Sequence, residues 1–387
     1  MPATLLILPV VGRLHAPRIQ NQIDQLVDQL TVHGLKVHLH DIHYPGSSPP
    51  EIDEGAYDAV VVLAGSGGIS RTLVSILSHR RWVLWAYRGN NSLPAALSAR
   101  EKLRSSNAWR GFLATSPEQV VWIARLLHAV HSGIRLTVVN PRSERLQELR
   151  ALEKYGFRIE SRHVAKSALE AATPSPHKLP PPPKDAASAL KLLSVLRQNP
   201  FDALTVDCFP LLTELGVTPC LALAALIEDD IPAICEADVA ATLVATAVQI
   251  AIRTPFWMAN LVEADAINNR LLFAHCTIAP SLTADLHYTP HFESGFPLAV
   301  RGYVKPGPVT ILYAPADLSY ITTFYGEILS EQPLRNDACR TQAWVRPSVT
   351  VDRILRTVGN HHILVLGRYS RLADAIGWVF NIPVHPL

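Results

Sequence analysis

The chain has 387 residues, of which 48% are hydrophobic and 18% charged, and its formal net charge is +2. This composition is typical of a globular protein and excludes a mainly disordered chain. The small net charge, without a long run of Lys or Arg, argues against nucleic acid as a partner, since nucleic-acid-binding proteins normally carry a basic stripe. A chain of this length exceeds one ordinary hydrophobic core, so we expect two or three domains.

The first part of the chain alternates between strand-like and helix-like segments. Residues 4–11 form a continuous apolar run, as in a buried parallel strand, and residues 19–33 have apolar side chains at helical spacing. Further strands are expected in LKVHLHDI, YDAVVVLAG and RWVLWAY, with helices after the second and third of them. This alternation predicts a Rossmann-like parallel α/β domain over residues 1–132.

A second α/β series follows, and then the pattern changes. Strand-like IRLTVVN, FRIESRHV and DALTVDCF alternate with helix-like segments, which predicts a second Rossmann-like parallel domain over residues 133–255. Residues 173–184 include four consecutive prolines, and we interpret them as a surface loop of this domain because the α/β pattern resumes after them. Short apolar runs with Pro and Gly punctuation predict a β-rich, barrel-like domain over residues 256–387.

The cysteines and the N-terminus bear on the compartment. The five cysteines are odd in number, include no CxxC pair and lie partly in apolar runs, which favours reduced, buried thiols: Cys208, Cys220, Cys235, Cys276 and Cys339. The N-terminus lacks the basic region and cleavage site of a signal peptide, and no run of about 18 apolar residues could span a membrane. We therefore expect a cytoplasmic protein without a membrane partner.

A Gly-rich turn in the first domain is a candidate ligand site. Residues 64–68, AGSGG, follow a predicted strand and open a predicted helix, as a cradle for a phosphate or hydroxyl group does. The turn lacks both the GxGxxG spacing and the Lys of a P-loop. Ser66 and Gly67 are therefore candidates for substrate binding, and a plain tight turn between strand and helix is the alternative.

Two acidic residues, Glu236 and Asp238, stand between an apolar strand and an Ala/Val-rich segment that we expect to be buried. An unpaired charge is costly in such a place, so the pair suggests a metal ligand or base together with a group that orients it. The alternative is that the acids cap the following helix, because carboxylates favour helix N-termini.

Several imidazoles follow in the last third of the chain. His275 ends an apolar strand, where a core histidine is the alternative to a ligand, and His361 and His362 precede the apolar run ILVL. His291 and Glu293 lie in a polar loop, and the alternative to a ligand site is that they are ordinary polar side chains on the surface. Mixed carboxylate and imidazole groups suit Mn²⁺ or another divalent metal. The absence of HExxH, CxxC and GxSxG argues against zincins, zinc ribbons and α/β-hydrolases.

The segments CEADVAAT, FAHCTIAP and GNHHILVLGRYSRLADAIGWVFNIPV occur in an order that resembles the fucose/arabinose isomerase superfamily. The wider pattern HCTIAP, HFESG, CRTQ and GNHH is most similar to the fucose isomerase-like proteins of bacteria and archaea. The resemblance covers roughly residues 200–387, whereas the first half is similar only in its α/β character. It implies a fucose isomerase-like fold, Mn²⁺ as cofactor and a homo-oligomer, trimeric or hexameric.

The resemblance also implies roles for single residues. Glu236 would be a metal ligand and general base, with Asp238 as the other catalytic acid, and His275 and His362 would be further ligands. The second acidic ligand of the family falls in FWMANLVE, where this chain has Asn260, an amide that can coordinate a metal but cannot act as a base. Asp238, Glu263 or Glu293 could replace the missing acid.

The function expected from these observations is a metal-dependent aldose–ketose isomerase that acts on an open-chain sugar or sugar phosphate through an enediol. The metal would hold the sugar oxygens and polarise the carbonyl. The expected substrate-binding residues come from four places in the chain: Ser66, Gly67, Asp207, Cys208, His291, Glu293, Asn360 and His361. The alternatives are a non-catalytic sugar-binding or regulatory protein, and a related enzyme for aldol or lyase chemistry.

Overall fold

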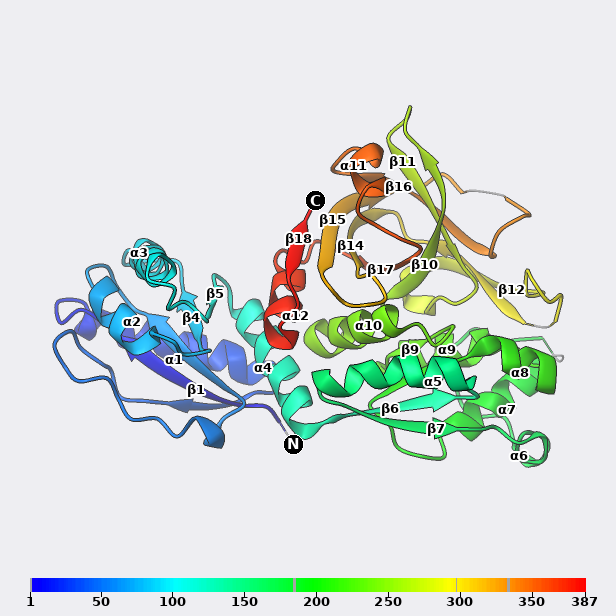
Figure 1. The fold of residues 1–387 in the computed structure, drawn as a ribbon, viewed down its shortest axis with the longest axis horizontal. Coiled ribbons are helices and arrows are strands. Elements are labelled where there is room, and N and C mark those ends of the chain that lie inside the picture. The colour runs from blue at the N-terminus through cyan, green and yellow to red at the C-terminus, as the bar shows by residue number, and fades with distance from the viewer. Residues whose placement is uncertain (1, 184–185, 297, 333–334) are drawn as a thin grey trace. The chain divides into compact units, whose positions relative to one another are not determined.

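The computed structural model describes residues 2–183, 186–296, 298–332 and 335–387 of the chain (Figure 1). These residues form two compact units, Met1–Ser132 and Gly133–Leu387. Parallel α/β sheets occur in both units, and a closed antiparallel sheet occurs in the second. The predicted combination of α/β structure with a β-rich part is therefore confirmed.

The first unit is built on a parallel five-stranded sheet with the order β2-β1-β3-β4-β5. Its strands are β1 (Thr4–Val10), β2 (Lys36–Leu39), β3 (Ala59–Ala64), β4 (Val83–Ala86) and β5 (Phe112–Ala114). Its helices are α1 (Ala16–Val32), α2 (Ser70–Leu77), α3 (Ser92–Ser105) and α4 (Pro117–Ser132), with a short 3₁₀ helix, η1 (Glu54–Ala56). The central strand β3 is buried at every residue, which explains its continuous apolar sequence.

The Gly-rich turn between β3 and α2 is packed tightly against β1. The hydroxyl of Ser66, which is fully buried, accepts a hydrogen bond from the backbone N–H of Gly12 at 2.9 Å and donates to the carbonyl of Gly67 at 3.1 Å. A Cβ atom on Gly65 would lie 2.6 Å from Val11 Cγ2 and 2.7 Å from Ile19 Cδ1. Packing against the neighbouring strand and helix therefore explains why small residues occur at positions 65 and 66, and no ligand is needed to explain them.

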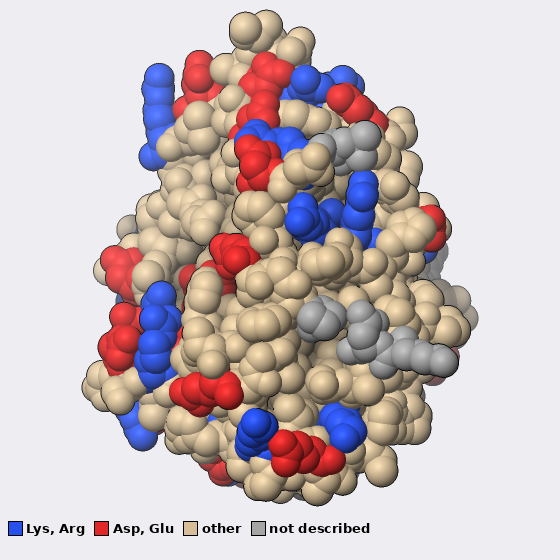
Figure 2. Space-filling view, turned by 90° about the vertical axis from the view of Figure 1, so that its right-hand side faces the viewer, with Lys and Arg blue, Asp and Glu red and all other residues tan. Residues whose placement is uncertain are grey.

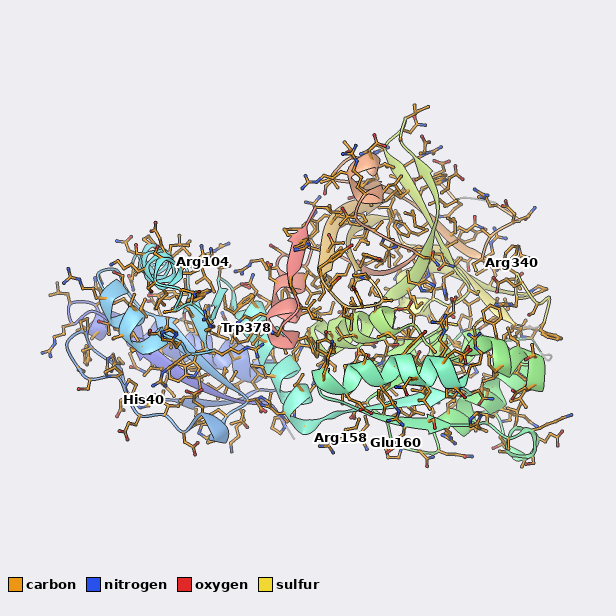
Figure 3. All side chains as sticks on the ribbon, viewed as in Figure 1. His40, Arg104, Arg158, Glu160, Arg340 and Trp378 are labelled. Atoms are coloured by element: carbon orange, nitrogen blue, oxygen red, sulfur yellow. The ribbon has the colours of Figure 1, made fainter. Side chains whose placement is uncertain are left out.

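The second unit begins with a four-stranded parallel sheet in the order β7-β6-β8-β9. Its strands are β6 (Ile134–Val139), β7 (Phe157–Arg162), β8 (Ala203–Val206) and β9 (Ala233–Ile234). Its helices are α5 (Ser143–Leu149), η2 (Arg150–Tyr155), α6 (Lys166–Ala171), α7 (Ala187–Leu196), α8 (Cys208–Leu215), α9 (Cys220–Glu228) and α10 (Val239–Ile252). Strand β7 is an edge, and its Arg158 and Glu160 side chains are exposed (Figure 3). Such charges protect an edge strand from pairing with another chain.

The predicted Pro-rich loop, residues 173–184, lies between α6 and α7. Residues 173–183 have no helix or strand, and Lys184 lies outside the described residues. The guanidinium of Arg197 donates hydrogen bonds to the Ser175 hydroxyl at 2.7 Å and to the Pro176 carbonyl at 2.6 Å. These bonds attach the first half of the loop to the end of α7.

The rest of the second unit contains the closed sheet. Strand β14 pairs with both β17 and β15, which closes the order β14-β17-β10-β11-β16-β15 into a barrel. The strands are β10 (Trp257–Asp265), β11 (Arg270–His275), β14 (Gly307–Tyr313), β15 (Ile321–Ile328), β16 (Thr341–Pro347) and β17 (His361–Leu366). The remaining elements are η4 (Pro280–Leu282), the paired β12 (Thr283–Thr289) and β13 (Ala299–Val304), α11 (Val351–Leu355), α12 (Leu372–Phe380) and β18 (Val384–Pro386).

Helix α10 connects the parallel sheet to the barrel. It contacts β9 on one side and β14 and β17 of the barrel on the other. Nearly every one of its side chains is buried, because both sides are covered. The Ala/Val-rich sequence, apolar all round, is what a helix in this position requires.

The described surface carries charges of both signs. Figure 2 shows one face of the molecule, on which Lys and Arg side chains alternate with Asp and Glu side chains in small groups. Among the described helices, none combines the length and the hydropathy needed to cross a bilayer.

We predict that Gly65→Ala destabilises the protein by about 1–3 kcal/mol, because the added methyl group overpacks the contact with β1 and α1. Urea unfolding measures this change. The control is Gly55→Ala, at an exposed position where the added Cβ would meet its nearest neighbour at an ordinary 3.4 Å. The control should change stability by less than about 0.5 kcal/mol, and an equal effect of both substitutions would contradict the packing argument.

Candidate metal centre

Three side chains converge in the second unit where the parallel sheet meets the barrel. Glu236 follows β9, His275 ends β11 and His361 begins β17. One ligand atom from each lies within 4.8 Å of the other two. The two carboxylate oxygens of Glu236 face different rings, with Oε1 3.6 Å from His275 Nε2 and Oε2 3.3 Å from His361 Nε2. Residues more than 120 positions apart in sequence are thus brought to one point.

The backbone at Glu236 has an unusual conformation. Glu236 and Ala237 both have positive φ, +65° and +49°, although neither is glycine. Each such residue costs on the order of 1–2 kcal/mol, so the surrounding structure must hold the turn. The backbone N–H of Ala237 donates to the Val206 carbonyl at 3.0 Å, which ties the turn to the end of β8. Strain of this kind is typical of positions where a side chain has to be aimed.

Asp238 caps a helix and also positions a histidine. Its Oδ1 accepts a hydrogen bond from the Ala241 backbone N–H at 2.7 Å, which caps α10. Its Oδ2 lies 3.0 Å from Nδ1 of His361. A hydrogen on this Nδ1 would donate to Asp238 and leave the Nε2 lone pair directed towards Glu236, as in many carboxylate–histidine–metal arrangements. With both oxygens engaged, Asp238 acts as a positioning residue.

Charge is concentrated in this group. Burial raises the pKa of Glu236, but the two neighbouring imidazoles lower it more, so the net pKa lies well below its usual range. Burial lowers the pKa of His361, but Asp238 and Glu236 outweigh this and raise the pKa to about 9. Glu236 is therefore ionised, and the pocket favours positive charge.

The donor atoms fit a bound cation. Both ring nitrogens of His275, Nε2 of His361 and Oδ1 of Asn260 are buried and make no hydrogen bond with the described residues. Unpaired buried polar atoms are costly, and coordination of an ion would satisfy them. Ligands bound at about 2.1 Å around one ion lie roughly 3–3.5 Å apart, close to the separations found here. Two imidazoles with one carboxylate suit a divalent transition metal.

Asn260 lies beside this group on β10, the strand between β11 and β17. It is the register partner of His361 on one side and of Ala274 on the other. Directly opposed residues of an antiparallel pair share a face of the sheet, so Asn260 is on the same face as His361. Its buried amide oxygen could supply a neutral fourth ligand, as the sequence predicted.

The predicted role of His362 is corrected by the structure. His362 is fully buried, its Nδ1 lies 2.9 Å from the carbonyl oxygen of Asn360, and its ring packs against Phe273, Tyr313 and Phe324. Burial lowers its pKa to about 4, so it is a neutral core residue. Neighbouring residues of a strand point to opposite faces, so only one histidine of the pair can face Glu236. That residue is His361, which the sequence analysis had assigned to the substrate.

Asp207, which the sequence analysis assigned to substrate binding, pairs with Arg142 of the same chain instead. Its fully buried carboxylate accepts hydrogen bonds from Arg142, at 2.9 Å from Nε and 3.2 Å from Nη2. The backbone N–H of Arg142 adds a third bond at 3.1 Å. Asp207 therefore joins the end of β8 to the start of α5, with its carboxylate already occupied by Arg142.

The other expected substrate residues are dispersed. Ser66 and Gly67 belong to the first unit, where a cavity of about 510 Å³ is lined by residues 86–94 and Thr115. The backbone N–H of Gly67 donates to the Asn90 carbonyl in the wall of this cavity. Gly67 thus contacts a residue that lines the cavity, whereas Ser66 is fully buried.

In the second unit, Cys208 is the buried first residue of α8, and the Asn360 carbonyl accepts from the Leu261 backbone N–H. His291 is buried in the loop between β12 and β13 that also contains Glu293. Glu263, a possible replacement for the missing acid, forms an ion pair with Arg335 instead.

No protein-family model matches this sequence, and no curated protein matches it either. Sequence reasoning missed two features of the site. It chose His362 as the ligand, whereas the structure brings His361 together with Glu236 and His275, and only the apolar run after the pair indicated a strand that places the two rings on opposite faces. It also missed that Cys220, Cys276 and His291 lie together.

We predict that His361→Ala weakens the binding of a divalent metal by at least roughly 100-fold, because one of three charged or imidazole ligands is lost. The neighbouring His362→Leu is the matched control and should retain metal affinity, although its loss of packing lowers stability. Isothermal titration calorimetry with Mn²⁺ or Zn²⁺ measures both. A loss of affinity confined to His362→Leu would restore the sequence-based assignment.

A second prediction concerns Asp207. Arg142→Ala leaves the buried carboxylate of Asp207 without a cationic partner, so we expect a loss of about 2–4 kcal/mol in the free energy of unfolding. Arg135→Ala removes the same kind of paired contact from Asp202, whose side chain is 42% exposed, and should lower stability much less because solvent screens an exposed ion pair. Urea denaturation distinguishes the two, and a small effect of Arg142→Ala would leave Asp207 available for another role.

Proposed function

We propose that this chain is a divalent-metal-dependent aldose–ketose isomerase whose centre is formed by Glu236, His275 and His361. The observation that carries the proposal is the convergence of these three side chains, with both ring nitrogens of His275 and Nε2 of His361 buried and without a hydrogen bond among the described residues. The resemblance of the surrounding segments to fucose and arabinose isomerases supports the sugar as substrate. Mn²⁺ is the proposed ion.

Each residue of the centre would have a separate role. His275, His361 and Glu236 would hold the ion, with the Asn260 amide oxygen beside them. The bound ion would act as a Lewis acid that polarises the carbonyl of the open-chain sugar. Asp238 would keep His361 in the tautomer that presents Nε2 to the ion.

Glu236 is the proposed base. Its side chain is 34% exposed, whereas those of His275 and His361 are 2% and 12% exposed, so Glu236 is the most accessible to a substrate. Its carboxylate would remove the proton from C2 of the aldose and return it to C1. Its low pKa keeps it ionised at neutral pH, which is the form that a base requires. One acid would then perform the transfer that the family shares between two.

The test is proton exchange at the sugar carbons. The Mn²⁺-loaded protein is incubated in D₂O with pentoses, deoxyhexoses and their phosphates, and NMR follows deuterium at C1 and C2 and the appearance of ketose. We expect exchange with at least one sugar, and a loss of roughly 10²–10⁴-fold in rate for Glu236→Gln.

The control for this experiment is Glu263→Gln, which removes a carboxylate of the same barrel that is engaged by Arg335. Its rate should stay near that of the unchanged protein. Full activity of Glu236→Gln would remove Glu236 from the role of base, and absence of exchange with every sugar would contradict the isomerase.

A second candidate function is a metal-dependent sugar-binding or regulatory protein. The observation that favours it is that neither Asn260 nor Asp238 offers a free carboxylate, because Asn260 is an amide and both oxygens of Asp238 are engaged. Such a protein would show thermal stabilisation by metal and sugar together, without deuterium exchange. Aldol or lyase chemistry would instead reveal shorter carbonyl products in the same NMR spectra.

A further inference from the structure

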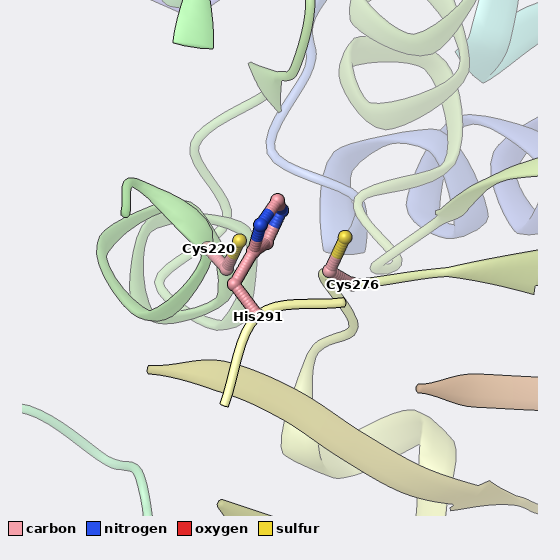
Figure 4. Close-up of side chains that lie close together, drawn as sticks. All are labelled: Cys220, Cys276 and His291. Carbon is pink, nitrogen blue, oxygen red and sulfur yellow. The ribbon is translucent and has the colours of Figure 1, made fainter. Parts of the chain in front are cut away.

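A second group of metal-binding side chains lies in the same unit. Cys220 begins α9, Cys276 follows β11 and His291 lies in the loop after β12, and Figure 4 shows these three side chains reaching one space from separate segments. One ligand atom from each lies within 4.8 Å of the other two. The three residues are only 2%, 7% and 6% exposed, respectively.

The loop around His291 is held by contacts of its own. The Ser294 hydroxyl lies 3.0 Å from His291 Nδ1, and the His291 backbone N–H donates to the Phe296 carbonyl at 2.8 Å. The guanidinium of Arg340, labelled in Figure 3, lies 5.3 Å from the centre of the Phe292 ring. The backbone N–H of Ser294 also donates a hydrogen bond to this Nδ1 at 3.3 Å, so Ser294 fixes the orientation of the His291 ring.

We propose that Cys220, Cys276 and His291 bind Zn²⁺ at a centre of their own. Thiolates are soft ligands and favour zinc over Mn²⁺ or Mg²⁺, in contrast to the carboxylate-containing group at Glu236. Bonds of about 2.3 Å to sulfur and 2.0 Å to nitrogen place tetrahedral ligands roughly 3.5–3.8 Å apart, within the spread found here. Binding converts each coordinating thiol to a thiolate and releases one proton per thiol to solvent.

Cys339 is a candidate for the fourth ligand. The sulfur of Cys339 lies 3.4 Å from that of Cys276, near the separation of two thiolates on one zinc ion. Cys339 is therefore the candidate for the fourth position, and its coordination would complete a Cys₃His site. A closed, buried site with four protein ligands is typical of structural zinc.

The proposed zinc centre is adjacent in sequence to the Glu236 group. His275 and Cys276 are consecutive, so one strand end carries a ligand of each group. Zinc at Cys276 would fasten the end of β11 to α9 and to the loop containing His291. The zinc would thereby hold His275 in place for the Glu236 group, which is a role distinct from catalysis.

The test uses Co²⁺ as a spectroscopic substitute for zinc. The reduced full-length protein is freed of metal, titrated with Co²⁺ and followed by absorbance. We expect an intense near-ultraviolet thiolate-to-cobalt band that Zn²⁺ displaces. The band should persist in Glu236→Gln and His361→Ala, and it should be lost in Cys220→Ser and Cys276→Ser.

The matched control is Cys235→Ser, which removes a buried thiol outside the group and should keep the band. Absence of the band in the unsubstituted protein overturns the proposal without reference to any variant. A zinc content equal to that of the unsubstituted protein in both Cys220→Ser and Cys276→Ser also overturns it. Metal binding abolished by Glu236→Gln, with no thiolate band, would leave the Glu236 centre standing and the thiolate centre refuted.

Discussion

The carboxylate of Asp238 joins the two halves of the second unit, and the candidate centre depends on it. One oxygen caps the first turn of α10, and the other lies 3.0 Å from His361 on the barrel strand β17. A cap of this kind is worth about 1 kcal/mol to a helix, and the contact with His361 adds to it because both groups are partly buried. The helix start and the histidine are therefore fixed by the same side chain.

The strained turn before Asp238 follows from the same constraint. Because β9 ends at Ile234 and α10 starts at Val239, only four residues connect them. Left-handed conformations at Glu236 and Ala237 turn the chain within this distance. The Glu236 carboxylate then faces Nε2 of two imidazoles, and neither Nε2 atom has a hydrogen bond among the described residues. An ion bound there would offset both the strain and the unpaired atoms.

Much of the fold could be predicted because it depends on local patterns. Continuous apolar runs such as residues 4–11 identify buried parallel strands, and an apolar helix such as residues 239–252 has to be covered on both sides. The closure of the barrel was harder to predict from the sequence, since it requires β14 to pair with both β17 and β15. Those pairings join segments far apart in sequence, and no local signal specifies them.

The candidate site, like the fold, could be predicted from the sequence only in part. The sequence singled out Glu236, Asp238, His275 and the pair His361–His362 as candidates one by one, because each is a charged or imidazole side chain next to an apolar segment, and the resemblance grouped them into one predicted centre. Only the tertiary structure decided which histidine faces the carboxylate, since a shift of one residue along a strand exchanges its two faces. It also decided that Asp207 pairs with Arg142 and that Cys220, Cys276 and His291 meet. Each of these depends on where distant elements pack, which side-chain chemistry alone does not specify.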